Sequence, residues 1–388
     1  MKNELRESEW HLIRNNNGEW ICDEYVVEMD KLTADNYQKK ALRLGLDLNI
    51  QNGPEGEFWC YKFQIEAIDA AEKWTKQQIK NVTSNMKTMS KRSFTEKCRK
   101  LQSCFREKNG WEMGVGPYRS SKNFQINMLV NGEDTGNNFV NDFAFQYAKD
   151  RVGHKKENET FDEYRLFNNL LSSQPMAFNL FCPFIEMLEK GKEKEVTSIF
   201  QGIFPDKGIE KVSEVVLEYL HNEIKNYLND KTAMDVIIRY IDDEGKKSFI
   251  AIETKYTDVL GTNSPSETML HKEWIKRLAE FKEESEKKLL NNEKPISQIY
   301  RNFLLTECYG VLEGANHYYS IVLAPAQHPT TLEEVNSLKD ELKPEYQYKI
   351  SSVTLEDFIE KTLKICPQSE AAPFIYFKDR YLDFSKLE

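Results

Sequence analysis

Two apolar segments of this sequence contain acidic side chains that a buried β-strand does not usually tolerate. Asp235 lies within the β-prone residues 233–241, and Glu253 and Lys255 directly follow the apolar residues 249–252. Burial of an ionised carboxylate is costly unless a partner neutralises it. A divalent cation would therefore explain why both acids occur at these positions.

Two carboxylates and a lysine suit the hydrolysis of phosphodiester bonds. The carboxylates can hold Mg²⁺, which polarises the phosphate and helps to deprotonate a water molecule. The lysine can orient that water and offset the charge that develops on the phosphate. Its positive charge also helps to keep both acids ionised. We therefore expect Asp235, Glu253 and Lys255 to be catalytic, with the two acids as metal ligands.

The segments that hold these residues are predicted to form a β-hairpin. Residues 233–241 and 248–256 are β-prone, and the turn between them contains Asp242, Asp243 and Gly245, which are residues favoured in hairpin turns. Because side chains alternate along a strand, Glu253 and Lys255 share one face. Strand formation would place the three charged groups near the ends of two adjacent strands.

Helices are predicted on both sides of this hairpin. Before it, apolar residues recur at helical spacing in several segments, including Val212 to Leu228. After it come a charged amphipathic helix over 271–290, another near 299–304, a buried strand over 318–325 and a short helix over 355–363. The order of these elements predicts an α/β fold and no array of internal repeats.

The composition is typical of a soluble intracellular protein. The 388 residues are 40% hydrophobic and 30% charged, with a net charge of −10. No apolar run approaches the ~20 residues that span a bilayer, and the first ten residues do not resemble a signal peptide. The seven cysteines form no Cys-x-x-Cys pair, which favours reduced thiols in the cytoplasm. We expect a cytoplasmic protein with no membrane partner.

One segment of this acidic chain is strongly basic. Residues 72–108 contain eleven basic and three acidic residues, a local excess of +8. The segment is either a solvated helix face or a surface that contacts phosphates. For the second possibility, the candidate substrate-binding residues are Lys91, Arg92, Arg99 and Lys100.

The catalytic pattern resembles the PD-(D/E)XK nuclease superfamily, whose signature is an Asp on one strand and Glu-x-Lys on the next. Here Met234 precedes the Asp in place of Pro, a departure that many members share. Further runs resemble a bacterial branch of restriction-type endonucleases, over roughly residues 105–365; they are SSQPMAFNLF (172–181), VVLEY (215–219), ETKYTD (253–258) and QIYRN (298–302).

The resemblance implies further site residues. Superfamily sites usually have another acid, often on a helix before the strands, and Glu218 within the expected helix is our choice as metal ligand or water-orienting residue. Glu163 is its rival, and Gln174 either replaces this acid, contacts the scissile phosphate or caps a helix. Gln298 and Arg301, on the helix after the strands, would either orient the lysine or hold a phosphate, or simply form an exposed polar helix face.

The resemblance also implies a fold and an activity. The fold is a restriction-endonuclease-like core, a central mixed sheet flanked by helices, over residues 105–388, with an N-terminal α+β region over 1–104 that binds substrate or a partner. The activity is a Mg²⁺-dependent endonuclease acting on double-stranded DNA in restriction or anti-phage defence, with Mn²⁺ as a substitute and a homodimer or a defence protein as partner. The alternatives are a nuclease for RNA or structured DNA, and a non-catalytic nuclease-fold module of a larger complex.

Overall fold

The computed structural model divides the chain into two compact units, Met1–Met89 and Ser90–Glu388. It describes residues 12–14, 20–22, 26–44, 46, 48–52, 58–61, 64–66, 68–69, 94–114, 127–155, 162–221, 224–229, 231–258, 260 and 269–387. No helix in these ranges is long and apolar enough to cross a membrane. Lys91 and Arg92, which we expected to bind substrate, lie outside the described residues.

The first unit is a small α+β structure with a core of its own. A two-stranded and a three-stranded antiparallel sheet accompany the helix α1, and the core holds Met29, Ala34, Cys60 and Ile65. Its elements are β1 (Leu12–Arg14), β2 (Trp20–Cys22), β3 (Val26–Met29), α1 (Lys31–Leu44), β4 (Gln51–Asn52) and β5 (Phe58–Tyr61). This unit is the α+β extension that we expected before the nuclease-like core.

The division between the units lies earlier in the chain than the expected boundary at 104/105. Residues 94–108 form a helix, and its buried Gln102 donates hydrogen bonds to the Tyr256 hydroxyl at 3.2 Å and to the Arg380 carbonyl at 2.9 Å. This helix is therefore part of the second unit. It packs against the segment that directly follows Lys255.

A mixed five-stranded sheet forms the centre of the second unit. The strand order is β10-β9-β8-β7-β6; β6, β7 and β8 pair antiparallel, whereas β8, β9 and β10 pair parallel. The strands are β6 (Ile209–Tyr219), β7 (Met234–Asp242), β8 (Lys247–Thr254), β9 (Tyr318–Ala324) and β10 (Ile350–Thr354). The predicted hairpin is confirmed as β7 and β8, and the predicted strand over 318–325 as β9.

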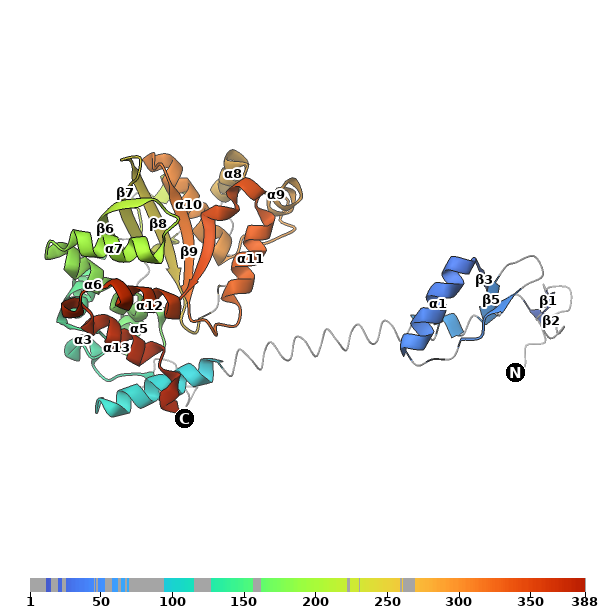
Figure 1. Ribbon diagram of the computed structural model, residues 1–388, viewed down its shortest axis with the longest axis horizontal. Coiled ribbons are helices and arrows are strands. Elements are labelled where there is room, and N and C mark those ends of the chain that lie inside the picture. Colours follow the sequence, from blue (N-terminus) through green and yellow to red (C-terminus); the bar gives the residue numbers. More distant parts are fainter. Residues whose placement is uncertain are drawn as a thin grey trace. The chain divides into compact units, whose positions relative to one another are not determined.

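Helices cover both faces of this sheet (Figure 1), and each face has its own apolar core. The core on the first face lies beneath α4 (Asp142–Gly153), α5 (Glu163–Asn168), α6 (Ser173–Glu189), α7 (Glu193–Ile203), α12 (Leu355–Ile365) and α13 (Ala372–Tyr381). On the second face, the helices are α8 (Met269–Leu278), α9 (Glu283–Leu290), α10 (Gln298–Glu313) and α11 (Thr331–Glu341). The short α3 (Gly132–Thr135) lies beside α5. This is the expected restriction-endonuclease-like α/β architecture.

The predicted helix over 212–228 is wrong, because its first part is the edge strand β6. The pairing of β6 with β7 shifts register between Ile209 and Lys211 and again between Val212 and Glu214. Each β-bulge inserts a residue, so inward-facing positions move apart. The buried residues Ile209, Val212 and Val215 consequently recur every three positions, which imitates the periodicity of an amphipathic helix.

A buried charge cluster joins α10 to the segment that directly precedes β10. The Lys349 ammonium contacts the Glu280 and Glu307 carboxylates, and all three side chains are buried. Burial and the nearby Glu280 raise the pKa of Glu307 well above its usual value. The single lysine therefore stabilises two acids that repel each other.

Replacing Lys349 by methionine is expected to lower the free energy of unfolding by about 3–5 kcal/mol, because both acids lose their buried cation. Burial and Glu280 already raise the pKa of Glu307, and loss of the lysine removes the cation that opposes this rise, so the destabilisation is largest at high pH. It falls as protons bind with decreasing pH. Thermal unfolding at pH 5 and pH 8 measures this difference, with Glu307→Gln as the control that retains the ion pair to Glu280. A Lys349→Met variant as stable as wild type at pH 8 contradicts the account.

Candidate active site

Three acidic residues occupy one row across the antiparallel strands β6, β7 and β8. Leu217 pairs with Val236 and Tyr219 with Met234, which places Glu218 opposite Asp235. Val236 pairs with Ile252, which places Glu253 opposite Asp235 on the other side. Directly opposed residues have their Cβ atoms about 5 Å apart. The strand pairing therefore aligns three acidic residues on three neighbouring strands.

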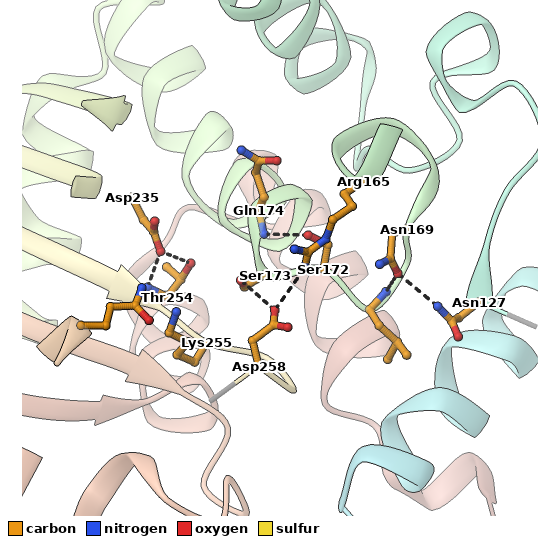
Figure 2. Close-up of polar contacts among 12 residues, drawn as sticks. Asn127, Arg165, Asn169, Ser172, Ser173, Gln174, Asp235, Thr254, Lys255 and Asp258 are labelled. Atoms are coloured by element: carbon orange, nitrogen blue, oxygen red, sulfur yellow. Dashed lines mark hydrogen bonds and ion pairs between the residues drawn. The ribbon is translucent and has the colours of Figure 1, made fainter. Parts of the chain in front are cut away.

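The central acid, Asp235, is held by Thr254, which lies between Glu253 and Lys255 in the sequence. The Thr254 amide and hydroxyl both donate to Asp235 Oδ2, at 2.8 and 2.9 Å (Figure 2). Burial, followed by the nearby Glu253 and Glu218, raises the pKa of Asp235 well above its usual value, although Lys255 and the Thr254 amide oppose the rise. Burial is thus the main cause of the rise, and repulsion by the two other acids adds to it.

Glu253 and Lys255 form a buried ion pair beside Asp235. The Lys255 ammonium lies 2.6 Å from Glu253 Oε1, and the side chains are only 8% and 7% exposed. Burial acts to lower the pKa of Lys255, but the Glu253 and Asp235 carboxylates outweigh it and the pKa is raised. The Lys255 amide donates to the Leu323 carbonyl of β9 at 2.8 Å, which fixes the backbone where β8 ends. Lys255 is thus a positioned cation at neutral pH.

Glu253 has two further partners on α10. Gln298 Nε2 donates to its Oε1 at 2.9 Å, and Asn302 Nδ2 donates to its Oε2 at 2.7 Å. Gln298, which we expected to orient the lysine or hold a phosphate, thus donates to the acid. Asn302 was absent from the predicted residues although it stands in the QIYRN run. Its spacing of four from Gln298 on a helix was the available signal.

Glu218 adopts a backbone conformation that is unusual for a residue with a side chain. Its φ is +52°, in the left-handed region that costs energy for non-glycine residues. Arg151 Nη2 donates to its carbonyl at 2.9 Å, and Gln174 Nε2 donates to its Oε1 at 2.9 Å. These contacts hold the last residues of strand β6 in place. Strain of this kind is concentrated at functional sites.

Gln174 lies in the first turn of α6, the helix that packs across β6, β7 and β8. The backbone N–H of Gln174 donates to the Ser172 hydroxyl oxygen at 3.4 Å, so Ser172 and not Gln174 caps the helix. The side-chain amide of Gln174 donates to Glu218 Oε1 at 2.9 Å. The structure therefore brings Gln174 and Glu218 together, whereas the sequence presented them as alternatives.

The rival acid Glu163 lies in the first turn of α5, with an exposed side chain 4.0 Å from the Lys155 ammonium. Its neighbour Arg165 lies 3.6 Å from Asp258, and the Ser173 hydroxyl donates to the same carboxylate at 3.3 Å (Figure 2). These contacts tie the α5–α6 junction to the segment after β8. They do not bring Glu163 into the row of acids.

The remaining predicted substrate residues fall in different environments. Arg301 is half-buried on α10, and its Nε has no hydrogen-bond partner in the described part of the chain. Lys100 is exposed. Arg99 is buried, and its guanidinium donates to Asn127 and lies 3.8 Å from Glu96. Arg99 thus holds the helix over 94–108 against residue 127.

Comparison with known proteins gives one match. The model of the PD-(D/E)XK nuclease superfamily matches residues 89–383, which include the five-stranded sheet, its covering helices and the residues of the candidate site. No curated protein and no solved structure matches the chain. The family match begins where the second structural unit begins. Because it extends over more than half of the sequence, the chain belongs to the PD-(D/E)XK nuclease superfamily.

Proposed function

We propose that this protein is a metal-dependent endonuclease that hydrolyses phosphodiester bonds in DNA at the row of acids on β6, β7 and β8. The observation that supports this most strongly is the opposition of Asp235 and Glu253 on adjacent strands with the buried Lys255 ammonium beside them. Membership of the superfamily indicates nuclease chemistry, a nucleic-acid substrate and a divalent metal ion. The identity of the metal, DNA as the substrate and the residue roles are our proposal.

The donor set fits a hard divalent cation. Carboxylate oxygens are the ligands that Mg²⁺ and Mn²⁺ prefer, and repulsion by Glu253 and Glu218 contributes, after burial, to the raised pKa of Asp235. Within the described ranges, no three Asp, Glu, His or Cys side chains converge as a ready-made cage. Mg²⁺ does not need one, because it is usually bound by one or two carboxylates, waters and substrate phosphates.

Each residue of the site has a distinct proposed task. Asp235 and Glu253 would hold the ion, which supplies polarisation of the phosphate and a lowered pKa for a water molecule. Lys255 has a raised pKa and stays protonated at neutral pH, so it acts as a cation toward the phosphate or the attacking water and not as a general base. Glu218, oriented by Gln174, is a third ligand or accepts a hydrogen bond from the water.

The substrate side of the proposal rests on basic residues of the chain. Arg301 lies on α10 next to the Glu253 partners, and we propose that it binds a phosphate. Lys100 and the basic residues before it, Lys91 and Arg92, would extend the contact, whereas the buried Arg99 would act by holding Lys100's helix in place. The N-terminal unit would bind substrate or a partner. A setting in cytoplasmic defence, with a homodimer or a defence protein, comes from the sequence resemblance.

Purified protein is expected to cleave plasmid DNA with Mg²⁺ or Mn²⁺ and to be inactive with EDTA, because the acids alone cannot polarise a phosphate. Parallel incubations with linear double-stranded DNA, single-stranded DNA and RNA define the substrate class. Glu214→Gln, an exposed acid on β6 paired with Arg239, is the control and should retain wild-type cleavage. Cleavage of RNA alone would replace DNA as the substrate. Failure of a folded protein to cut any of these nucleic acids would favour a non-catalytic module.

A further inference from the structure

The Glu253 carboxylate is held on both of its oxygens by two side chains from one face of α10. Gln298 Nε2 donates to Oε1 at 2.9 Å and Asn302 Nδ2 donates to Oε2 at 2.7 Å. Residues four apart on a helix are neighbours on its surface, so one face of α10 meets the carboxylate with two parallel donors. Two contacts on two oxygens fix both the position and the rotation of a carboxylate.

The burial pattern of α10 places these two amides outside the apolar core. Around them Ile299, Tyr300 and Phe303 are buried, whereas Gln298 and Asn302 are only half-buried. Polar side chains are common at half-buried helix positions. What distinguishes these two is that both donate to the same carboxylate, Glu253.

The orientation of the Asn302 side-chain amide is energetically unfavourable for its oxygen. Its Oδ1 is buried and has no hydrogen-bond partner in the described part of the chain. Buried carbonyl groups are usually paired, and an unpaired one calls for an explanation. Here the explanation is that the amide nitrogen is committed to Glu253 Oε2, which leaves the oxygen without a donor.

The neutrality of the two amides matters for an ion site. An amide N–H orients a carboxylate without cancelling its charge, whereas a second lysine or an arginine would compete with a metal ion for it. Among the described residues, Lys255 is the one cation that contacts Glu253, at Oε1, and Oε2 receives only the Asn302 amide. The carboxylate is thus fixed and retains charge for a cation.

We propose that Asn302, with Gln298, is a positioning residue that holds the Glu253 carboxylate in the orientation needed to bind a divalent ion. This inference rests on the proposed function, because it takes Glu253 to be a metal ligand. Neither amide touches the reacting atoms. Both act through Glu253, as hydrogen-bonding partners of metal ligands commonly do.

The test compares Asn302→Leu with wild type by calorimetric titration with Mn²⁺ and by cleavage over a range of Mn²⁺ concentrations. Leucine has a similar volume and no donor, so we expect the affinity for Mn²⁺ to fall about 10- to 100-fold. Cleavage should be weak at low Mn²⁺ and recover toward the wild-type rate at saturating Mn²⁺. A purely structural role would not produce this rescue.

The matched control is Thr306→Val, one turn further along α10. The Thr306 hydroxyl donates to the backbone carbonyl of Asn302 at 2.9 Å and does not contact Glu253. The affinity for Mn²⁺ should therefore stay at the wild-type value. If Asn302→Leu does not fold, Gln298→Leu, which removes the donor to Oε1, carries the same prediction.

The outcomes separate this inference from the proposed function. If wild type binds Mn²⁺ and the folded Asn302→Leu variant binds it equally well, the positioning role is overturned and the nuclease proposal stands. If wild type binds no Mn²⁺ with or without DNA, the ion site itself is wrong and both proposals fall. Weaker binding in Asn302→Leu, with unchanged binding in Thr306→Val, supports the inference.

Discussion

Asp235→Asn is expected to reduce DNA cleavage by at least about 10³-fold, because the substitution removes a carboxylate that would bind the ion at the centre of the row. Asparagine has nearly the same shape. Its carbonyl oxygen can still accept the Thr254 amide and hydroxyl that now bond to Asp235 Oδ2. The local backbone is therefore preserved, and the loss reports on charge.

The same variant is expected to be more stable than wild type in the absence of metal. Burial, Glu253 and Glu218 raise the pKa of Asp235 above 3.8, so the folded wild-type chain holds a proton that the unfolded chain releases. Its stability falls as pH rises from 3.8 toward the raised pKa. The neutral asparagine avoids this cost, and we expect a gain of roughly 0.5–2 kcal/mol at neutral pH, which should vanish toward acid pH.

Plasmid cleavage with Mg²⁺ and thermal unfolding with EDTA measure the two effects. Glu214→Gln on β6 is the matched control, because its exposed carboxylate pairs with Arg239 away from the row; neither cleavage nor pH dependence should change. Cleavage by Asp235→Asn at the wild-type rate would disprove the site assignment. A large loss of stability would instead show that the carboxylate serves the fold.

Lys255→Met is expected to reduce cleavage by about 10²–10³-fold through loss of the cation that faces the phosphate or water. Removing one partner of a buried ion pair also costs about 3–5 kcal/mol of stability in the metal-free protein. Glu253 loses the ammonium at 2.6 Å, but it retains the amides of Gln298 and Asn302. The carboxylates should therefore remain able to bind a metal ion.

This combination gives Lys255→Met a distinctive signature. A bound ion stabilises the folded state by mass action, and here it would also neutralise acids that have lost their internal cation. Saturating Ca²⁺ or Mn²⁺ should thus raise the melting temperature of Lys255→Met more than that of wild type. Lys246→Met, in the exposed turn between β7 and β8, is the control. Equal metal-induced shifts, or undiminished cleavage, would contradict the role given to Lys255.

Two predicted helices show where local pattern misleads. The bulges of β6 gave a strand the spacing of a helix around Glu218. The single helix predicted over 271–290 is two helices, because the chain turns at Ala279, whose φ is +53°, and places Glu280 against the buried Lys349. In both cases the deciding partner lies elsewhere in the sequence, in β7 or near β10. The periodicity of one segment contains no information about partners that lie elsewhere in the sequence.

The sequence by itself determined the hairpin of β7 and β8 and the three groups Asp235, Glu253 and Lys255 that it brings together. Strand alternation and a cross-strand turn are local properties, so the residue types were enough to predict them. Even the family could be inferred from these residues and the short runs around them.

Only the tertiary structure decided which groups surround these three. Glu218 stands opposite Asp235 through the pairing of β6 with β7, Gln174 reaches Glu218 from α6, and Asn302 reaches Glu253 from α10. Each contact joins residues far apart in the chain, because helices from opposite faces meet the same end of the sheet. The residue types that supply the chemistry of the site lie close together in the sequence, whereas the orientation of its carboxylates depends on how distant helices pack.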